Sequence, residues 1–274
     1  MENNVNIKVD HFCIMVDDLL TATRNFEALG FIVTQGSNTG GKSGNALIVF
    51  ENKVCIELVC FGNHRFRKVL LALTEPTGLL KRMFTGEKTL MRRFLKHWTV
   101  ASKGVWADWC LAATPLEDII SAARKRGLEL AEQPFTHERF KADGGHVKWR
   151  MGGGLDVSLP FLIEEIEDSA ERVPIRLNAR HPNGARRLTR VILGSAHPEQ
   201  TIKDLEALTG LKRNGPILNI DGVEIKVEQD SAYKTALPKE LIFCTDGADF
   251  TAKTLDTALT GGAAITVQEE GDAK

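Results

Sequence analysis

The sequence predicts an α+β fold in which a βαβββ unit is repeated along the chain. The first observation is a recurring series, found four times in 274 residues, of a short apolar strand, a helix ended by glycine and further strand material. The second is the tight turns between the later strands, of which Asp221-Gly222 is typical of a hairpin. The third is composition, because 43% hydrophobic and 26% charged residues suit a globular chain with a sizeable core.

The first unit is expected over residues 5–61. Val9–Val16 has the pattern of a strand, and Asp17 and Asp18 can cap the helix that follows. The apolar residues of that helix recur on one face, and Gly30 ends it. The strands that complete the unit are Ala46–Phe50 and Lys53–Phe61.

The second unit is expected over residues 105–167. Its first strand is Val105–Ala113. The string Thr114-Pro115-Leu116-Glu117 then combines a capping box with proline at the first helical position, and Gly127 ends the helix. The following strands are Gly145–Met151 and Leu155–Ile163.

Two shorter units are expected over residues 188–270. The third begins with the strand Leu188–Gly194, uses Ser195 as a helix cap and closes with a hairpin. The fourth has a strand, a helix and one more strand. Their remaining elements are the strands Ile217–Ile220, Val223–Glu228, Glu240–Thr245 and Ala264–Gln268, and the helix Asp249–Leu259.

Two segments lie outside the repeat. Residues 62–104 have helical spacing of apolar residues interleaved with many cations, which suits either a covering helix with a solvated basic face or a lid that attracts anions. Residues 168–187 are an irregular connector that contains the turn-rich string His181-Pro182-Asn183-Gly184.

Charge and hydropathy exclude several classes of protein. The net charge of -1 removes the electrostatic case for a dedicated nucleic-acid binder. No apolar run is long enough for a membrane span, and Met1–Asp10 lacks the apolar core of a secretory signal, so a cytoplasmic location is expected. The five cysteines include no CxxC pair, which favours free thiols in a reducing compartment over a zinc ribbon.

Strand alternation brings two polar residues onto one surface. In the first strand His11 lies opposite the face that packs on the helix, and in Lys53–Phe61 the same holds for Glu57. An imidazole and a carboxylate on adjacent strands form half of a divalent-metal site. A hydrogen-bonded core histidine and a salt bridge at the sheet edge are the alternatives.

Several strings resemble the vicinal oxygen chelate superfamily, which includes glyoxalases, bleomycin-resistance proteins and dioxygenases. Asp10-His11, Val16-Asp17-Asp18-Leu19 and Phe26–Phe31 resemble the opening signature of that superfamily. Gly144–Arg150, Leu159–Glu164 and His181–Ala185 resemble its glyoxalase-like domain group.

The resemblance implies paired modules whose mixed sheets curl into cups, with helices on the outside and a helical insertion. It implies a glyoxalase-like module pair over residues 5–167, interrupted by the insertion 62–104, and a second, degenerate pair over 188–270 after the connector 168–187. Metal ligands in the superfamily come from the first and last strands of paired modules. His11 and Glu57 match these positions, and Glu164 is a candidate third ligand, although it can equally end its strand.

Aligning the helix starts puts Asp108 opposite His11, where an ion-pair or turn residue is favoured over a ligand. Further residues are expected to shape the cup and to bind substrate. Asn45 opens a strand at its rim, His146 can line the cup or face solvent, and Arg150 can bind a carboxylate. Phe161 suits an apolar wall, and Trp149, with Trp106 and Trp109, fits either stacking on a substrate or packing in the core, which is favoured.

Three functions remain open from the sequence. The first is a metal-dependent isomerase, lyase or dioxygenase in which a divalent ion (Zn, Ni, Mn or Fe) acts as Lewis acid on a small oxygen-rich molecule. Glu57, His146 or Glu164 would move protons in it. The second is a binding protein that sequesters a small molecule, as bleomycin-resistance proteins do. The third is an interaction protein whose modules hold shape only. The expected partner is a small-molecule ligand, and the chain is expected to be a monomer or a homodimer.

Overall fold

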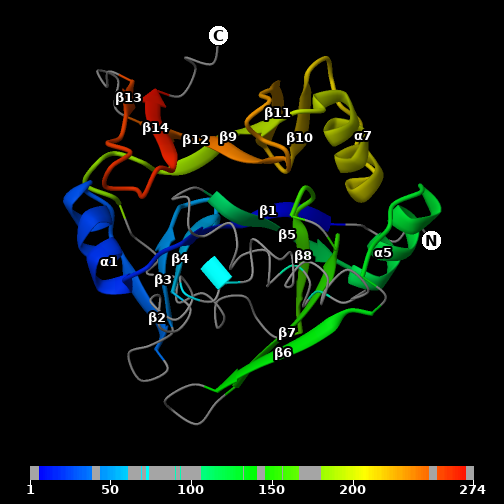
Figure 1. Cartoon of the computed structure of the whole chain (residues 1–274), viewed down its shortest axis with the longest axis horizontal. Coiled ribbons are helices and arrows are strands. Elements are labelled where there is room, and N and C mark those ends of the chain that lie inside the picture. The colour runs from blue at the N-terminus through cyan, green and yellow to red at the C-terminus, as the bar shows by residue number, and fades with distance from the viewer. Residues whose placement is uncertain are drawn as a thin grey trace.

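The computed structural model contains two mixed β-sheets, one above the other, with helices at their sides (Figure 1). The first has eight strands in the order β2-β3-β4-β1-β5-β8-β7-β6, and the second has six in the order β10-β11-β9-β12-β14-β13. The residues that the structure describes are 6–38, 44–60, 69, 72–73, 90, 93, 106–131, 133–140, 146–155, 157–166, 180–246 and 252–269.

The first sheet is built from two βαβββ units whose first strands pair at its centre. In the first unit β1 is parallel to β4, and in the second β5 is parallel to β8. The strands β1 and β5 pair antiparallel and join the two halves. Strand bounds are β1 Asn6–Met15, β2 Thr34–Asn38, β3 Gly44–Val49, β4 Cys55–Cys60, β5 Trp106–Thr114, β6 Phe135–Phe140, β7 His146–Gly153 and β8 Phe161–Glu165.

The second sheet repeats this plan with fewer strands. β9 is parallel to β11 and antiparallel to β12, and β12 is parallel to β14. The bounds are β9 Arg187–Ser195, β10 Ile217–Ile220, β11 Val223–Gln229, β12 Leu237–Thr245, β13 Lys253–Thr254 and β14 Ala264–Glu269. The predicted α+β fold of repeated βαβββ units with curled sheets is therefore confirmed.

Helix α1, Leu19–Ala28, begins as the sequence predicts. Asp18 is its N-cap, and the carboxylate of Asp18 accepts the backbone N–H of Thr21 at 2.7 Å. The helix buries Ala22, Thr23 and Phe26.

Helices α5 and α7 begin differently from the prediction. Helix α5, Leu116–Lys125, has Pro115 as N-cap with no side-chain bond, and Glu164 of β8 accepts the N–H of Leu116 instead. Helix α7, Pro198–Thr209, has His197 as N-cap, and the Ser195 hydroxyl accepts the His197 N–H from just before the helix. Each N–H is thus satisfied by a polar side chain outside the observed N-cap: Glu164 from a neighbouring strand, and Ser195, the predicted cap, from two residues before His197.

The predicted helix Asp249–Leu259 is wrong for the part that the structure describes. Lys253 and Thr254 form β13 and pair with β14. A turn follows, in which the Asp256 carboxylate accepts the Ala258 N–H. The threonines of this segment are β-branched, and the aspartate bonds its own backbone, so both disfavour a helix interior.

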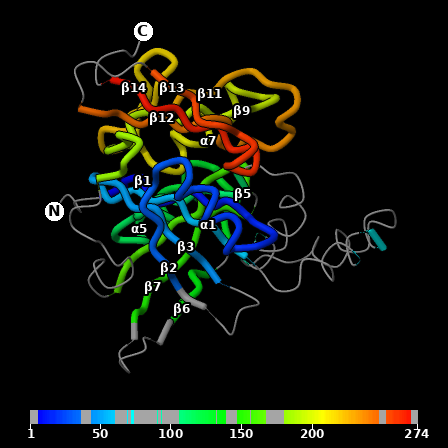
Figure 2. Tube along the Cα trace, turned by 90° about the vertical axis from the view of Figure 1, so that its left-hand side faces the viewer, coloured from blue at the N-terminus to red at the C-terminus, as the bar shows by residue number. Residues whose placement is uncertain are grey.

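One hydrophobic core joins the two sheets. Its buried residues come from β1, β4 and β5, from β9, β11, β12 and β14, and from the helices α1, α5 and α7. β12 of the second sheet also contacts β5 of the first, and the view from the side shows the second sheet lying over β1 (Figure 2). The expected core role of Trp106 and Trp109 is confirmed, since the exposed fractions of their side chains are 1% and 0%.

Parts of the expected architecture lie outside the described residues. These are most of the insertion 62–104, of which Val69, Ala72, Leu73, Leu90 and Arg93 are described, and most of the connector 168–187. Among the described residues no helix is long and apolar enough to cross a membrane. All five cysteines are free thiols.

Candidate metal centre

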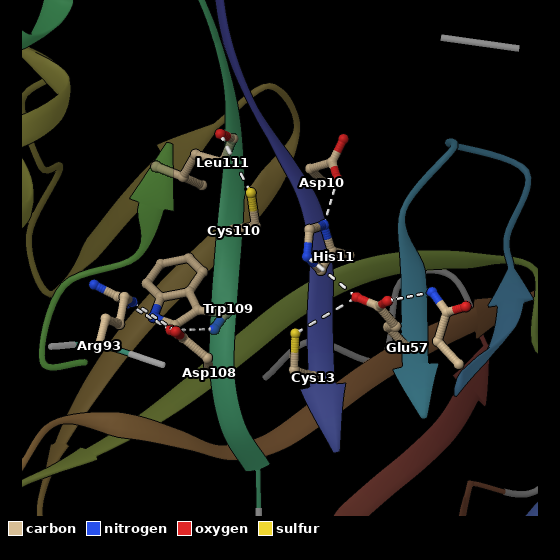
Figure 3. A network of polar contacts seen from close by, with 10 residues as sticks. Asp10, His11, Cys13, Glu57, Arg93, Asp108, Trp109, Cys110 and Leu111 are labelled. Atoms are coloured by element: carbon tan, nitrogen blue, oxygen red, sulfur yellow. Dashed lines mark hydrogen bonds and ion pairs between the residues drawn. The ribbon is translucent and has the colours of Figure 1, made fainter. Parts of the chain in front are cut away.

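The candidate site lies on the face of the first sheet that turns away from the shared core. On this inner face β1 contributes His11 and Cys13, β4 contributes Glu57, and β5 contributes Asp108 and Cys110 (Figure 3). Alternation explains the arrangement, because the intervening residues Phe12, Ile14 and Ile56 belong to the shared core.

His11 is buried, and both of its ring nitrogens have acidic neighbours. Nδ1 lies 2.5 Å from Asp10 Oδ1, and Nε2 lies 3.6 Å from Glu57 Oε2. Asp10 reaches the ring because the pairing of β1 with β5 shifts register between Val9 and His11, which makes Asp10 the extra residue of a β-bulge. An ionised Asp10 can only accept, so Nδ1 is the donor of this pair, and the tautomer that donates from Nδ1 has its lone pair on Nε2.

Glu57 is held by neighbours on both sides. Its Oε1 accepts a hydrogen bond from Asn45 Nδ2 at 2.5 Å, and its Oε2 faces both His11 and the Cys13 thiol, whose Sγ lies 3.8 Å away. Burial raises the pKa of Cys13 well above its ordinary value, and the charges of Glu57 and Asp108 raise it further.

These groups form a set of donors that suits a divalent metal. The ligand atoms of His11, Cys13 and Glu57 all lie within 4.8 Å of one another, and so do those of Asp10, His11 and Cys110. Imidazole, thiolate and carboxylate are the ligand types of zinc sites. The carboxylate on the far ring nitrogen of His11 is also the usual outer partner of a metal-binding histidine.

Asp108 occupies the position in the second unit that His11 occupies in the first. It is fully buried, and the Arg93 guanidinium contacts both of its oxygens at 2.5 and 2.6 Å. Arg93 also donates to the carbonyls of Gly154 and Leu159. The expectation of an ion-pair role for Asp108 is thus confirmed, with a cation from the insertion as its partner.

Phe161 packs directly against the candidate site. Its ring meets the His11 ring edge-on, with centroids 5.2 Å apart, and Arg93 lies over it at 5.5 Å. Phe161 pairs with Cys110, two residues after Asp108, just as Glu57 pairs with Cys13, two residues after His11. An apolar ring therefore stands where the second unit would have placed the counterpart of Glu57.

The structure places Glu164 and Arg150 away from His11. Arg150 of β7 binds the carboxylates of Glu164 and of Glu117 in α5, and Glu164 accepts the first N–H of that helix. Arg150 lowers the pKa of Glu117, and the two carboxylates raise the pKa of Arg150. Both predicted residues thus take part in one ion-pair network at the start of α5.

The two remaining predicted substrate-binding residues are Trp149 and His146. Trp149 is half-buried, contacts a cluster of buried residues that includes Cys110, Met151 and Phe161, and packs against His137, with ring centroids 4.6 Å apart. His146 begins β7, but its side chain lies outside the described part of the chain.

Sequence reasoning missed Asp10 and Arg93 as neighbours of the site. Strand alternation assigns Asp10 to the face opposite His11, because a bulge cannot be recognised from the residue types. Arg93 is one of many cations in the insertion, and nothing local marks it as the partner of Asp108. Cys13 could have been found, because alternation already places it on the face of His11.

Comparisons with known proteins give a family match and similar folds. The model of the glyoxalase-like domain matches residues 9–209. No curated protein matches the chain. A hypothetical protein from Staphylococcus aureus has a similar structure, with a TM-score of 0.68 and 17% identity over 96% of this chain and 100% of its own.

A xylose isomerase-like TIM barrel/4-hydroxyphenylpyruvate dioxygenase fusion protein is also similar. Its TM-score is 0.53 at 11% identity, and the match covers 97% of this chain and 50% of the fusion protein. At these identities both solved structures show the fold alone. The assignment to a family therefore depends on the match of the glyoxalase-like domain model. The chain belongs to the glyoxalase-like domain family of the vicinal oxygen chelate superfamily.

Proposed function

We propose that the protein is a divalent-metal-dependent enzyme of the glyoxalase type that acts on a small oxygen-bearing organic molecule. The supporting observation is the 3.6 Å approach of His11 Nε2 to Glu57 Oε2. Asp10 holds the proton on the other ring nitrogen, so two acceptor atoms face each other. A proton or a metal ion between them satisfies both, and a carboxylate behind the ring is the usual outer partner of a metal-bound histidine.

His11 Nε2 and Glu57 Oε2 are the atoms that would hold the ion. A divalent ion bound there would supply Lewis acidity toward adjacent oxygens of the substrate. The protein's own part is orientation, since Asp10 fixes the His11 ring and Asn45 fixes Oε1 of Glu57. Phe161 excludes water from one side of the imidazole. The Glu57 carboxylate is the proposed acceptor of a substrate proton, through a lone pair that the ion does not use.

The donor set favours an isomerase or a lyase over an iron dioxygenase. Non-haem iron dioxygenases use two histidines and one carboxylate. Among the described side chains of the inner face, His11 is the one imidazole close to Glu57. We therefore propose proton transfer next to a carbonyl as the reaction class.

The metal content of untagged protein tests the proposal. Wild type is expected to hold about one divalent ion per chain after reconstitution with Zn, Ni, Mn or Fe(II), and His11→Ala is expected to lose it. His197→Ala, at the exposed N-cap histidine of α7, is the matched control and should keep the metal. Wild type that takes up none of these ions would overturn the metal-dependent function.

A non-catalytic binding protein of the bleomycin-resistance type is the second candidate. It is favoured by the second unit, where Arg93 neutralises Asp108 and an apolar ring occupies the position equivalent to Glu57. In that case a small molecule binds at the inner face without turnover. A ligand that binds both wild type and His11→Ala equally well in the absence of metal would support this candidate.

A further inference from the structure

We propose that Cys13 is the third protein ligand of the metal, which makes the site a His11, Cys13 and Glu57 centre of the zinc type. This inference rests on the proposed function and names the donor that gives the site its selectivity. It concerns one side chain, and its test does not depend on knowing the substrate.

The strand geometry places the three donors on one side of a common point. His11 and Cys13 are two residues apart on β1, so both side chains leave the same face of the strand. Glu57 is the direct partner of Cys13 in the parallel pairing of β1 with β4. Figure 3 shows the imidazole, the thiol and the carboxylate pointing toward one another.

The distances are close to those of a tetrahedral site. With metal–ligand distances of about 2.0 Å to nitrogen or oxygen and about 2.3 Å to sulfur, neighbouring donor atoms lie roughly 3.3–3.6 Å apart. In the structure Nε2 and Oε2 are 3.6 Å apart, and Sγ and Oε2 are 3.8 Å apart. Shifts of a few tenths of an ångström would complete the arrangement, leaving one position open for substrate or water.

Charge supports the same set of ligands. A thiolate at Cys13 and the carboxylate of Glu57 together balance a divalent cation, so the buried centre is neutral with a neutral His11. Asp108 also faces Cys13, but Arg93 already neutralises it. A thiolate donor selects zinc-type ions over Mg²⁺ or Ca²⁺, which prefer oxygen ligands.

The competing cysteine is Cys110, on the other side of His11. Its cluster uses Asp10, but the Asp10 carboxylate is engaged with Nδ1 of the same imidazole at 2.5 Å. Cys110 Sγ also donates to the carbonyl of Leu111 on its own strand. Cys13, whose sulfur faces Glu57, is therefore the better ligand.

Cobalt substitution distinguishes the two cysteines. Wild type loaded with Co²⁺ is expected to show a thiolate-to-cobalt charge-transfer band in the near ultraviolet. Cys13→Ser should lose this band and bind Zn²⁺ at least tenfold more weakly, while Cys110→Ser and Cys60→Ser should keep both. Cobalt bound to wild type without the band, or a band lost in Cys110→Ser and kept in Cys13→Ser, would overturn the inference and leave the proposed function standing.

Wild type that binds no Co²⁺ or Zn²⁺ would overturn the inference and the metal-dependent function together. X-ray absorption of the zinc-loaded wild type gives a test that needs no variant, in case Cys13→Ser does not fold. A sulfur shell at about 2.3 Å is expected beside nitrogen and oxygen at about 2.0–2.1 Å. A spectrum with only the shorter shell would contradict the assignment of Cys13.

Discussion

Gly36 and Asn45 together set the position of the Glu57 carboxylate. A Cβ added at Gly36 would clash with Asn45 Oδ1, so a larger residue there would displace the amide that donates to Glu57. We expect Gly36→Ala and Asn45→Ala to weaken zinc binding by a similar factor, about 10–100-fold, because both release the carboxylate. Chelator competition measures this, with Gln35→Ala on the same strand as control. A loss in Asn45→Ala without one in Gly36→Ala would contradict the steric argument.

His181 is a neutral residue on which acid stability depends. Its Nδ1 accepts the Ile32 N–H at 3.0 Å, its Nε2 donates to the Val49 carbonyl at 3.2 Å, and burial lowers its pKa from 6.5 to about 4. Because the unfolded chain binds the proton first, the neutral ring's contribution is complete above pH 6.5 and is lost as the pH falls toward 4.

Between about pH 7.5 and pH 4.5 this loss amounts to roughly 2–3 kcal/mol of unfolding free energy. Urea unfolding at the two pH values measures it. His181→Gln keeps one donor and one acceptor without titrating, so its stability should change less between the two conditions. An equal change in wild type and variant would show that other groups are responsible.

The residues of the candidate site were predictable where strand alternation is regular. Alternation has a period of two, so it placed His11, Cys13 and Glu57 on one face from the sequence alone. It could not place Asp10, because a bulge adds one residue without changing residue types. It also could not find the contact between Arg93 and Asp108, because Arg93 lies outside the repeated strands and has no place in their alternation.

At the scale of the elements, the same bulge recurs in each unit. The pairing of β1 with β5 has extra residues Asp10 and Ala107, and the pairing of β9 with β12 has extra residues Thr189 and Lys239. The residue after each bulge stands at an equivalent position: His11, Asp108, Arg190 and Glu240. His11, Asp108 and Arg190 also stand equally far ahead of α1, α5 and α7.

This recurrence explains why aligning the helix starts correctly identified Asp108 as the residue equivalent to His11. The elements that could not be predicted are those that owe their structure to a neighbour. β13 exists because Lys253 and Thr254 pair with β14, and β2 and β6 are outer strands whose sequences lack a strong apolar pattern. Local composition does not record such pairing.

The link between the insertion and β5 depends on a buried ion pair. Side-chain exposure is 2% for Arg93 and 0% for Asp108. Arg93→Met leaves a buried carboxylate without its cation and is expected to cost about 3–5 kcal/mol of unfolding free energy. The double variant with Asp108→Asn removes the charge and should recover a large part of that loss.

Denaturant unfolding measures both variants. Arg213→Met, in an exposed pair with Glu199, is the matched control and should leave the midpoint unchanged. A double variant that is no more stable than Arg93→Met alone would show that packing of the long side chain, and not charge, is what Arg93 contributes.

Across the whole molecule, each of the four units has a different pair of residues at the positions equivalent to His11 and Glu57. Beside His11 and Glu57, the second unit has Asp108 and Phe161, and the later units have Arg190 with Lys226 and Glu240 with Thr266. Arg190 is paired with Glu224 at 2.6 Å, and the Thr266 hydroxyl donates to Glu240 at 2.5 Å. Only the first unit combines an imidazole with a carboxylate, so the metal chemistry that we propose belongs to that unit.

The second sheet packs against the first through their common core. The core residues of both sheets form one cluster, and Phe50 of the first unit stacks on Phe243 of β12 with ring centroids 4.1 Å apart. Arg126, after α5, donates to the Ala207 carbonyl near the end of α7. Because apolar contacts cross the boundary throughout, we expect the two sheets to unfold as one cooperative unit.

Leu205→Ala tests this cooperativity from a distance. Leu205 is a fully buried residue of α7, and its truncation is expected to cost about 2–5 kcal/mol. All four tryptophans lie before residue 150, so their fluorescence reports on the first sheet and its insertion. If unfolding is cooperative, Leu205→Ala lowers the fluorescence midpoint in denaturant together with the circular dichroism midpoint. The control is Leu211→Ala, at an exposed leucine just after α7, which should move neither midpoint. A fluorescence midpoint that stays at the wild-type value while the dichroism signal splits into two transitions would show that the sheet carrying the site folds independently of the second sheet.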